Sequence, residues 1–120
     1  MRYAVVDEKG TVEIHETTFP IQADIIREVL KDKSEGSTDE GWLEGLTGPS
    51  FAIYLNENGK YLALKPNRLM TSYARKHHMI SERDFIVGNC VLTGLPNEEG
   101  YETSITDEAL TELVEHSLTM

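Results

Sequence analysis

The sequence predicts an α+β fold in a single domain over residues 1–120, with a mainly antiparallel sheet of about five strands and two to three helices packed on it. Three observations lead to this prediction. Short β-branched runs are bounded by turn residues, amphipathic helical runs lie among them, and the two types follow no regular βαβ alternation. An antiparallel sheet with the helices on one face buries these runs most simply. A chain of 120 residues is long enough to form one such core.

The chain begins with a predicted hairpin and a helix. Residues 3–6 and 11–15 are β-branched runs on either side of a turn that contains Gly10, which predicts two paired strands. From residue 21 to residue 30 the apolar side chains recur at helical spacing. Pro20 suits the start of this helix, because the first helical turn has spare N–H groups.

Residues 31–49 form a long polar stretch that we expect to be a mobile loop. Loops of this length within a compact domain are usually either functional or disordered. The stretch contains the only tryptophan of the chain, Trp42, which we expect to anchor the loop on the core. The alternative is that Trp42 is an exposed anchor for a partner, since tryptophan is enriched at binding hot spots.

A second hairpin is the clearest local signal in the sequence. Residues 50–55 and 60–64 are apolar runs, and the Asn-Gly pair at 58–59 supplies the positive-φ residues that a tight turn needs. Pro66 then begins a predicted helix that extends to His78, with an apolar stripe facing inward and a basic face outward.

The last third of the chain supplies the remaining elements. Residues 84–93 are apolar on both faces, which predicts a central strand with Gly88 as a bulge or a point of close approach. A short strand is expected at residues 101–104. The final helix is expected to begin at Thr106, because threonine is a good N-cap and two acidic residues follow in the first turn.

Charge is distributed unevenly along this acidic chain, whose net charge is −10. Residues 60–83 contain six Lys or Arg side chains and one acid, whereas residues 84–120 contain eight acids and no Lys or Arg. The acidic balance argues against a protein that coats DNA, because such binding requires a broad Lys/Arg surface. Binding to a basic protein surface agrees better with this composition.

Two charged surfaces are therefore candidates for partner binding. The predicted basic face, which suits phosphates or carboxylates, consists of Lys65, Arg68, Arg75, Lys76 and His77. The predicted acidic face, with its last three carboxylates on one outward helical stripe, consists of Glu98, Glu99, Glu108, Glu112 and Glu115. For each face the alternative is solvated surface charge without a partner.

No motif in the sequence names a reaction, and we expect no catalytic residue, metal or cofactor. There is no glycine-rich phosphate-binding loop. Cys90 lies within an apolar strand, where a buried structural thiol is expected, and a single cysteine excludes an internal disulfide. His77, His78 and Glu82 are metal-binding residue types, but adjacent histidines on a helix cannot both face one ion, so they are expected to extend the basic face.

The expected location is the cytoplasm. No apolar run approaches the roughly 18 residues of a membrane-spanning helix. The first residues do not form a secretion signal, because charged residues and a glycine at positions 7–10 interrupt the apolar run.

Four short segments resemble a family of small uncharacterised proteins from phages, plasmids and other mobile elements, a domain of unknown function. They are an Asn-x-x-Gly-Lys hairpin at 56–60, a Pro-Asn-Arg motif at 66–68, a Gly-bearing apolar strand at 84–94 and a Thr-Asp-Glu helix start at 106–108. The chain departs from the family pattern in its longer basic helix and in the polar loop that carries Trp42. The resemblance implies no established activity. It implies a setting in a bacterial host, where mobile elements often encode small acidic inhibitors of host defence.

The expected function is a non-enzymatic acidic binding protein of phage or mobile-element origin. It would inhibit a host nucleic-acid-acting or defence protein, as anti-restriction and anti-CRISPR proteins do, with DNA mimicry by the acidic face as one mode. The alternative is a module that binds a small anion, a nucleotide or nucleic acid through the basic helix at 66–78. A third, enzymatic interpretation requires titratable groups that converge in a pocket. The expected partner is a nucleic-acid-binding host protein, with direct nucleic-acid binding less favoured and no membrane partner.

Overall fold

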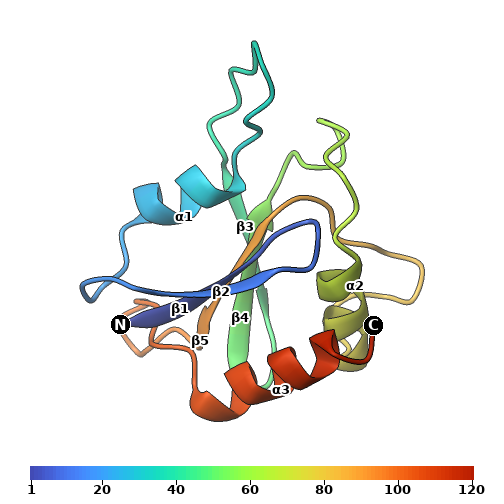
Figure 1. Ribbon diagram of the computed structural model, residues 1–120. Coiled ribbons are helices and arrows are strands. Elements are labelled where there is room, and N and C mark those ends of the chain that lie inside the picture. The colour runs from blue at the N-terminus through green and yellow to red at the C-terminus, as the bar shows by residue number, and fades with distance from the viewer.

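The fold is described by a computed structural model that covers all residues, 1–120. Its sheet contains β1 (Arg2–Val6), β2 (Val12–Glu16), β3 (Leu43–Thr47), β4 (Phe51–Asn56) and β5 (Cys90–Gly94). Its helices are α1 (Ala23–Leu30), α2 (Arg68–Lys76) and α3 (Asp107–Ser117). The strands form one antiparallel sheet in the order β2-β1-β5-β4-β3 (Figure 1), which confirms the predicted α+β class.

β5 lies at the centre of the sheet, as its apolar sequence predicts. It pairs with β1 on one side and with β4 on the other, and all of its residues are buried. The strand begins at Cys90 and not at residue 84, because Gly88 has a φ of +78° and its N–H donates to the Lys65 carbonyl at 2.8 Å. This bond links the residues just before β5, which we call the approach to β5, to the residues just before α2.

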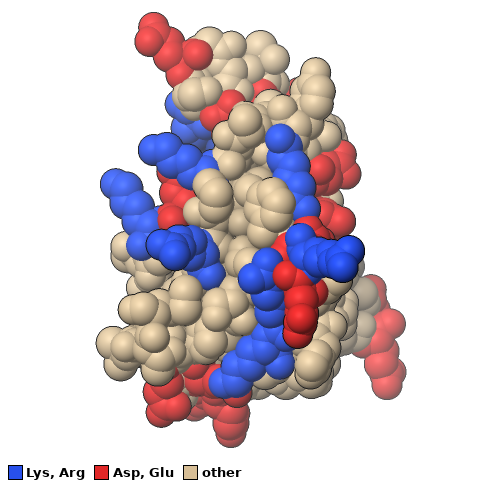
Figure 2. All heavy atoms as spheres, turned by 90° about the vertical axis from the view of Figure 1, so that its right-hand side faces the viewer, with Lys and Arg blue, Asp and Glu red and all other residues tan.

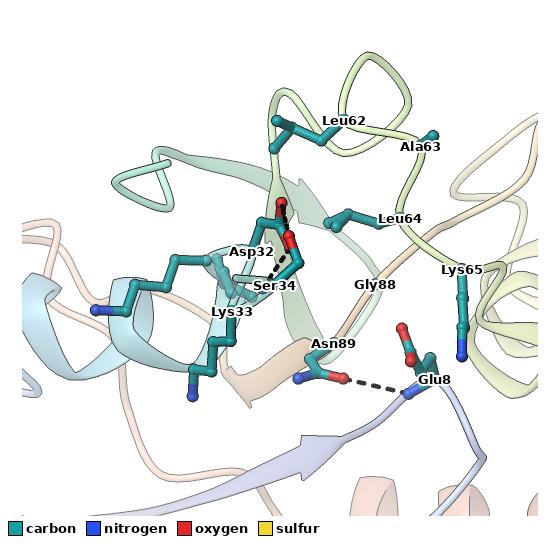
Figure 3. A pocket seen from close by; sticks show the side chains of 12 residues that line it. Glu8, Asp32, Lys33, Ser34, Leu62, Ala63, Leu64, Lys65, Gly88 and Asn89 are labelled. Atoms are coloured by element: carbon teal, nitrogen blue, oxygen red, sulfur yellow. Dashed lines mark hydrogen bonds between the residues drawn. The ribbon is translucent and has the colours of Figure 1, made fainter. Parts of the chain in front are cut away.

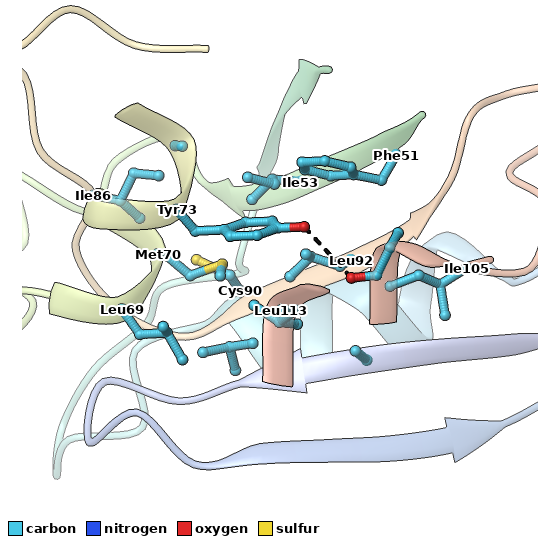
Figure 4. Packing of buried hydrophobic residues seen from close by; sticks show 14 residues of the cluster. Phe51, Ile53, Leu69, Met70, Tyr73, Ile86, Cys90, Leu92, Ile105 and Leu113 are labelled. Carbon is cyan, nitrogen blue, oxygen red and sulfur yellow. Dashed lines mark hydrogen bonds between the residues drawn. The ribbon is translucent and has the colours of Figure 1, made fainter. Parts of the chain in front are cut away.

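The helices cover both faces of the sheet, whereas one covered face was expected. Neighbouring residues of a strand point to opposite faces, so Tyr3 and Ala4 of β1 belong to different hydrophobic clusters. On one face α1 packs Ile26 and Leu30 against the sheet. On the other face α2 and α3 cover the larger cluster (Figure 4), which includes Phe51, Ile53, Met70, Tyr73, Leu92, Ile105 and Leu113. The result is three layers, with the sheet in the middle.

The predicted strand at residues 60–64 is wrong. The Asn-Gly pair lies in a turn, but neither residue has the positive φ that the hairpin signal predicts. The chain then continues in further turns, in which Leu62 N–H donates to the Asn58 carbonyl at 2.8 Å and Leu64 N–H donates to the Gly59 carbonyl at 3.0 Å. β4 has no free edge for residues 60–64, because β3 and β5 occupy its two sides. Residues 57–66, which we call the projecting segment, therefore extend beyond the end of the sheet (Figure 1). The short strand expected at 101–104 is also absent.

The polar stretch at 31–49 is not a continuous loop, because its second half forms the edge strand β3. Trp42, just before β3, is 49% exposed and does not enter the core. The Arg27 guanidinium lies 3.9 Å from the centroid of the Trp42 ring, and the Trp42 carbonyl accepts a bond from Glu57 N–H at 2.9 Å. Trp42 thus anchors the end of the loop on α1, and mobility of residues 31–42 stays a prediction. No helix in the fold is both long enough and apolar enough to span a membrane.

Candidate functional site

Asn67 fixes the start of α2 from the interior of the protein. Its side chain is fully buried and accepts a bond from Met70 N–H at 3.0 Å, which caps the helix. Its Nδ2 donates to the carbonyls of Val6 at 3.2 Å and Gly88 at 2.9 Å. The sequence prediction began this helix at Pro66 and missed the cap, although asparagine followed by a helical run is an N-cap signal. Asn67 joins α2, β1 and the approach to β5.

The predicted basic face is divided between the two ends of α2. Lys65 and Arg68 are exposed, and neither has a carboxylate within 4.0 Å. Arg75, near the other end, is partly buried and donates to the Asp84 carbonyl at 2.7 Å, while its Nε is buried without a partner. Lys76 Nζ lies 3.7 Å from a Glu112 carboxylate oxygen. These residues do not form one free cationic surface.

His77 lies between α2 and α3 and does not extend an exposed face. Its ring centroid is 5.1 Å from that of Phe51 and 4.9 Å from that of Tyr73, and its Nε2 is 2.5 Å from Glu112 Oε1. Glu112 also accepts a bond from the Tyr73 hydroxyl at 2.8 Å. Burial raises the pKa of Glu112, but hydrogen bonds from Tyr73 and His77 more than offset it, so the pKa is lowered overall. The expected outward stripe therefore loses its middle member to helix packing.

A serine and a histidine also meet where these helices pack. Ser72 Oγ lies 2.8 Å from His116 Nε2, and burial lowers the pKa of His116, which favours the neutral ring. Neither residue lines the larger cavities of the molecule. We therefore interpret the pair as a contact between α2 and α3. No three His, Cys, Asp or Glu side chains are grouped as a metal site.

The other predicted acidic residues are exposed at the C-terminal end of β5 and on α3. These residues are Glu98, Glu99, Glu108 and Glu115. None of them has a cationic partner within 4.0 Å. The turn after β5 is held by Asn97, whose Oδ1 accepts bonds from Glu99 N–H at 2.9 Å and Tyr101 N–H at 3.0 Å. Tyr101 stacks edge-on against Phe19, with both rings about half exposed.

A cleft that the sequence did not predict lies at the opposite end of β5. It has a volume of about 400 Å³ and opens between the C-terminal end of α1, the projecting segment and the turn after β1 (Figure 3). Gly88 and Asn89 contribute to its lining where β5 begins. Its charged lining residues are Glu8, Lys31, Asp32, Lys33 and Lys65.

Two of the three lysines in the cleft are free to meet a ligand. Lys33 and Lys65 have no carboxylate within 4.0 Å, whereas Lys31 Nζ lies 2.7 Å from a Glu28 oxygen. Asp32 is already engaged, because its carboxylate accepts bonds from the backbone and the hydroxyl of Ser34, each at 3.0 Å. These bonds lower the pKa of Asp32.

A second hollow of about 380 Å³ adjoins the cleft. It shares Glu8 with the cleft and adds Lys9 and Arg68, neither of which has an ion-pair partner. Figure 2 views the side of the molecule that carries α2 and the projecting segment, and shows Lys and Arg side chains around an uncharged middle, with Asp and Glu side chains among them. Lys and Arg side chains thus gather on this side of a protein whose net charge is −10, and some of them are held in ion pairs.

The fold and the cleft together define a small α+β protein with one antiparallel sheet between helical layers and a polar site, lined by lysines and carboxylates, where the central strand begins. One family model matches residues 1–117 and is described as a domain of unknown function, DUF3846. The chain belongs to this family. The comparisons with curated proteins and with solved structures give no match.

Proposed function

We propose that this protein is a non-enzymatic binding module that takes a small anionic ligand in the cleft at the start of β5. The observation that carries the proposal is the position of Lys33 and Lys65, which line opposite walls of the cleft without an ion-pair partner, although the Glu8 carboxylate lies on the same side as Lys65 (Figure 3). The alternative interpretation of the sequence placed anion binding on the helix at 66–78. The proposal keeps Lys65 and Arg68 from that set and moves the centre of the site to the cleft.

The size and charge of the cleft support a small anion as the ligand. A volume of about 400 Å³ lies within the roughly 300–1,000 Å³ of small-molecule sites. Charge-assisted hydrogen bonds from lysine to phosphate or carboxylate are about twice as strong as neutral ones.

The polar groups in the cleft favour binding over catalysis. The Ser34 hydroxyl donates to Asp32, and this carboxylate in turn caps the local turn by accepting from Ser34 N–H. A carboxylate whose pKa is lowered by such bonds is a weak general base. The lining therefore offers charge and hydrogen bonds to a ligand, and we propose no reaction for it.

Charge reversal in the cleft tests this proposal. We expect wild-type protein to bind inorganic tripolyphosphate in isothermal titration calorimetry, and the double variant Lys33→Glu/Lys65→Glu to lose at least about tenfold in affinity. The matched control, Lys76→Glu/Arg83→Glu, changes the net charge equally but lies outside the cleft, and it should retain nearly all of the affinity. Equal losses in the two variants, or no binding by the wild type, would contradict the proposal.

A second proposal concerns the acidic end, where Phe19 and Tyr101 form an exposed aromatic pair next to the turn that carries Glu98 and Glu99. Aromatic anchors with a charged rim are typical of protein interfaces. This arrangement supports a basic, nucleic-acid-acting or defence protein of a bacterial host as partner, in keeping with a phage or mobile-element origin. Any DNA mimicry would use Glu108 and Glu115 without Glu112.

A pull-down from nuclease-treated bacterial lysate tests the acidic end. We expect the wild type to capture a nucleic-acid-acting protein, and the variant Glu98→Lys/Glu99→Lys to lose it, because charge complementarity speeds association and suppresses wrong partners. The control Glu44→Lys/Glu57→Lys reverses two exposed carboxylates elsewhere and should retain capture. If both double variants capture the same proteins as the wild type, the acidic end is not the interface.

A further inference from the structure

We infer that the ligand of the cleft is a nucleotide, whose phosphates lie between Lys33 and Lys65 and whose base stacks on Tyr61. The inference rests on the proposed function and adds the class of ligand. It starts from Tyr61, which is 91% exposed on the projecting segment. An aromatic ring left in water at this level, beside a cationic cleft, is the arrangement with which proteins bind a base and its phosphates together.

The projecting segment holds Tyr61 on an ordered turn. Ala63 N–H donates to the Lys60 carbonyl at 3.1 Å, so that this turn closes around Tyr61 and Leu62. Ala63 has a φ of +55°, the left-handed conformation that non-glycine residues adopt only when their surroundings require it. The ring is therefore presented by a fixed backbone.

Leu64 anchors the projecting segment on the fold. A Cβ placed on Gly88 would lie 2.8 Å from Leu64 Cδ1, and a Cβ placed on Gly59 would lie 2.8 Å from Val87 Cγ2. Both glycines thus allow the segment to pack closely against the approach to β5. Because Lys65 follows Leu64 directly, the same anchor sets the positions of the ring and of one phosphate-binding lysine.

Tyr61 lines a hollow that adjoins the cleft. This hollow of about 510 Å³ is lined by Tyr61 and shares Asp32, Ser34 and Leu62 with the cleft. Its far wall is the loop at 34–39, which contributes Glu35 and Asp39. A ligand that occupies both spaces needs an anionic part in the cleft and an uncharged, flat part beside Tyr61.

The charges of the two spaces distinguish a nucleotide from a simple polyphosphate. Asp39 is engaged by Asn56 Nδ2 at 2.7 Å and by Asp32 N–H at 2.9 Å, whereas Glu35 has no ion-pair partner. The cleft has three lysines against the carboxylates of Glu8 and Asp32, whereas the hollow has carboxylates and no Lys or Arg. Phosphates are therefore favoured in the cleft and repelled in the hollow, where carboxylates can accept hydrogen bonds from the amino groups of bases. A nucleotide therefore matches both spaces, and a polyphosphate matches the cleft alone.

Calorimetry with ATP, GTP and inorganic tripolyphosphate tests the inference. We expect wild-type protein to bind at least one of the two nucleotides about tenfold more tightly than tripolyphosphate. The variant Tyr61→Ala should lose roughly five- to a hundredfold of the nucleotide affinity while its affinity for tripolyphosphate stays the same. Tyr61→Phe, which keeps the ring, should retain the nucleotide affinity, and Tyr101→Ala serves as the control for an exposed tyrosine outside the site.

The outcomes separate this inference from the proposed function. Suppose that the three ligands bind with equal affinity, that Tyr61→Ala has no effect and that Lys33→Glu/Lys65→Glu weakens the binding of all three. The inference that the ligand is a nucleotide is then wrong, and the proposed anion site stands. If the wild type binds none of the three ligands, both the inference and the proposed function are wrong. If Tyr61→Ala and Tyr61→Phe weaken nucleotide binding equally, the ring does not act by stacking and the inference fails.

Discussion

Replacement of Asn67 by alanine is expected to lower the free energy of unfolding by about 3 kcal/mol. The side chain is fully buried and supplies both the cap of α2 and two donated bonds to the carbonyls of Val6 and Gly88. Alanine would leave the Met70 N–H and the two carbonyls without these bonds in a site that water does not reach. Urea denaturation followed by circular dichroism measures this change in the free energy of unfolding.

Two further variants separate the contributions of Asn67. Thr106 caps α3 through a bond from Ala109 N–H at 3.1 Å but is itself exposed, so Thr106→Ala should cost only about 1 kcal/mol. Asn67→Ser keeps an acceptor that can cap the helix and adds no buried charge, but its side chain is too short to reach the two carbonyls, so its cost estimates the share of the donated bonds. If Asn67→Ala costs no more than Thr106→Ala, the bonds to β1 and to the approach of β5 contribute nothing to stability.

Gly94→Ala is expected to have the second largest effect, a loss of about 2–3 kcal/mol in the free energy of unfolding. A Cβ at this position would lie 2.4 Å from both the Ser104 carbonyl oxygen and Thr103 Oγ1. The neighbouring chain cannot move aside easily, because Gly94 N–H donates to the Thr103 carbonyl at 2.8 Å and Ile105 N–H donates to the Arg2 carbonyl at 2.9 Å. The same denaturation experiment measures this loss.

Gly100 provides the matched control for Gly94. A Cβ there would meet nothing within 4 Å, but its φ of +86° strains any other residue, so Gly100→Ala should cost about 1 kcal/mol. The difference between the two variants measures how firmly residues 103–105 are held over β5. Equal losses would mean that residues 103–105 move aside to accommodate a methyl group at position 94, which contradicts their close packing against Gly94.

The elements that were predicted correctly are those that local signals determine. The hairpin of β1 and β2 turns at Gly10, whose φ is +87°, and α3 begins at its threonine cap. β5 is central because its residues are apolar on both faces. In each case the residues on which the prediction depends also form the element itself, so pairing with distant segments does not change the result.

The wrong predictions came from competition between distant segments. The Asn-Gly signal at 58–59 correctly predicts a turn. Residues 60–64 cannot then pair with β4 as a hairpin strand, because β5, more than 30 residues later in the sequence, pairs along that edge of β4. β3 was missed because its sequence, Leu-Glu-Gly-Leu-Thr, is a weak strand that is paired along only one side. Pairing of this kind depends on which strand reaches an edge, and a single sequence does not encode that locally.

The candidate site could be predicted only in part, for a related reason. Lys65 and Arg68 were identified from the basic cluster, and both border the hollows on the cationic side. Lys33 lies in the stretch predicted as a loop, and it joins the site only because the projecting segment comes to face it. Glu112 and His77 were assigned to opposite faces, yet they bind each other, and counting charges along a chain does not reveal such a pair.

The carboxylates on the two edge strands have a consequence for the protein in concentrated solution. β2 and β3 each pair along only one side, so both offer backbone groups to which a second molecule could add a strand. Glu13 and Glu16 on β2 and Glu44 on β3 are exposed. Two molecules that approach edge to edge therefore meet with like charges, which opposes the growth of a shared sheet. Part of the acidity of this chain thus acts as protection against aggregation.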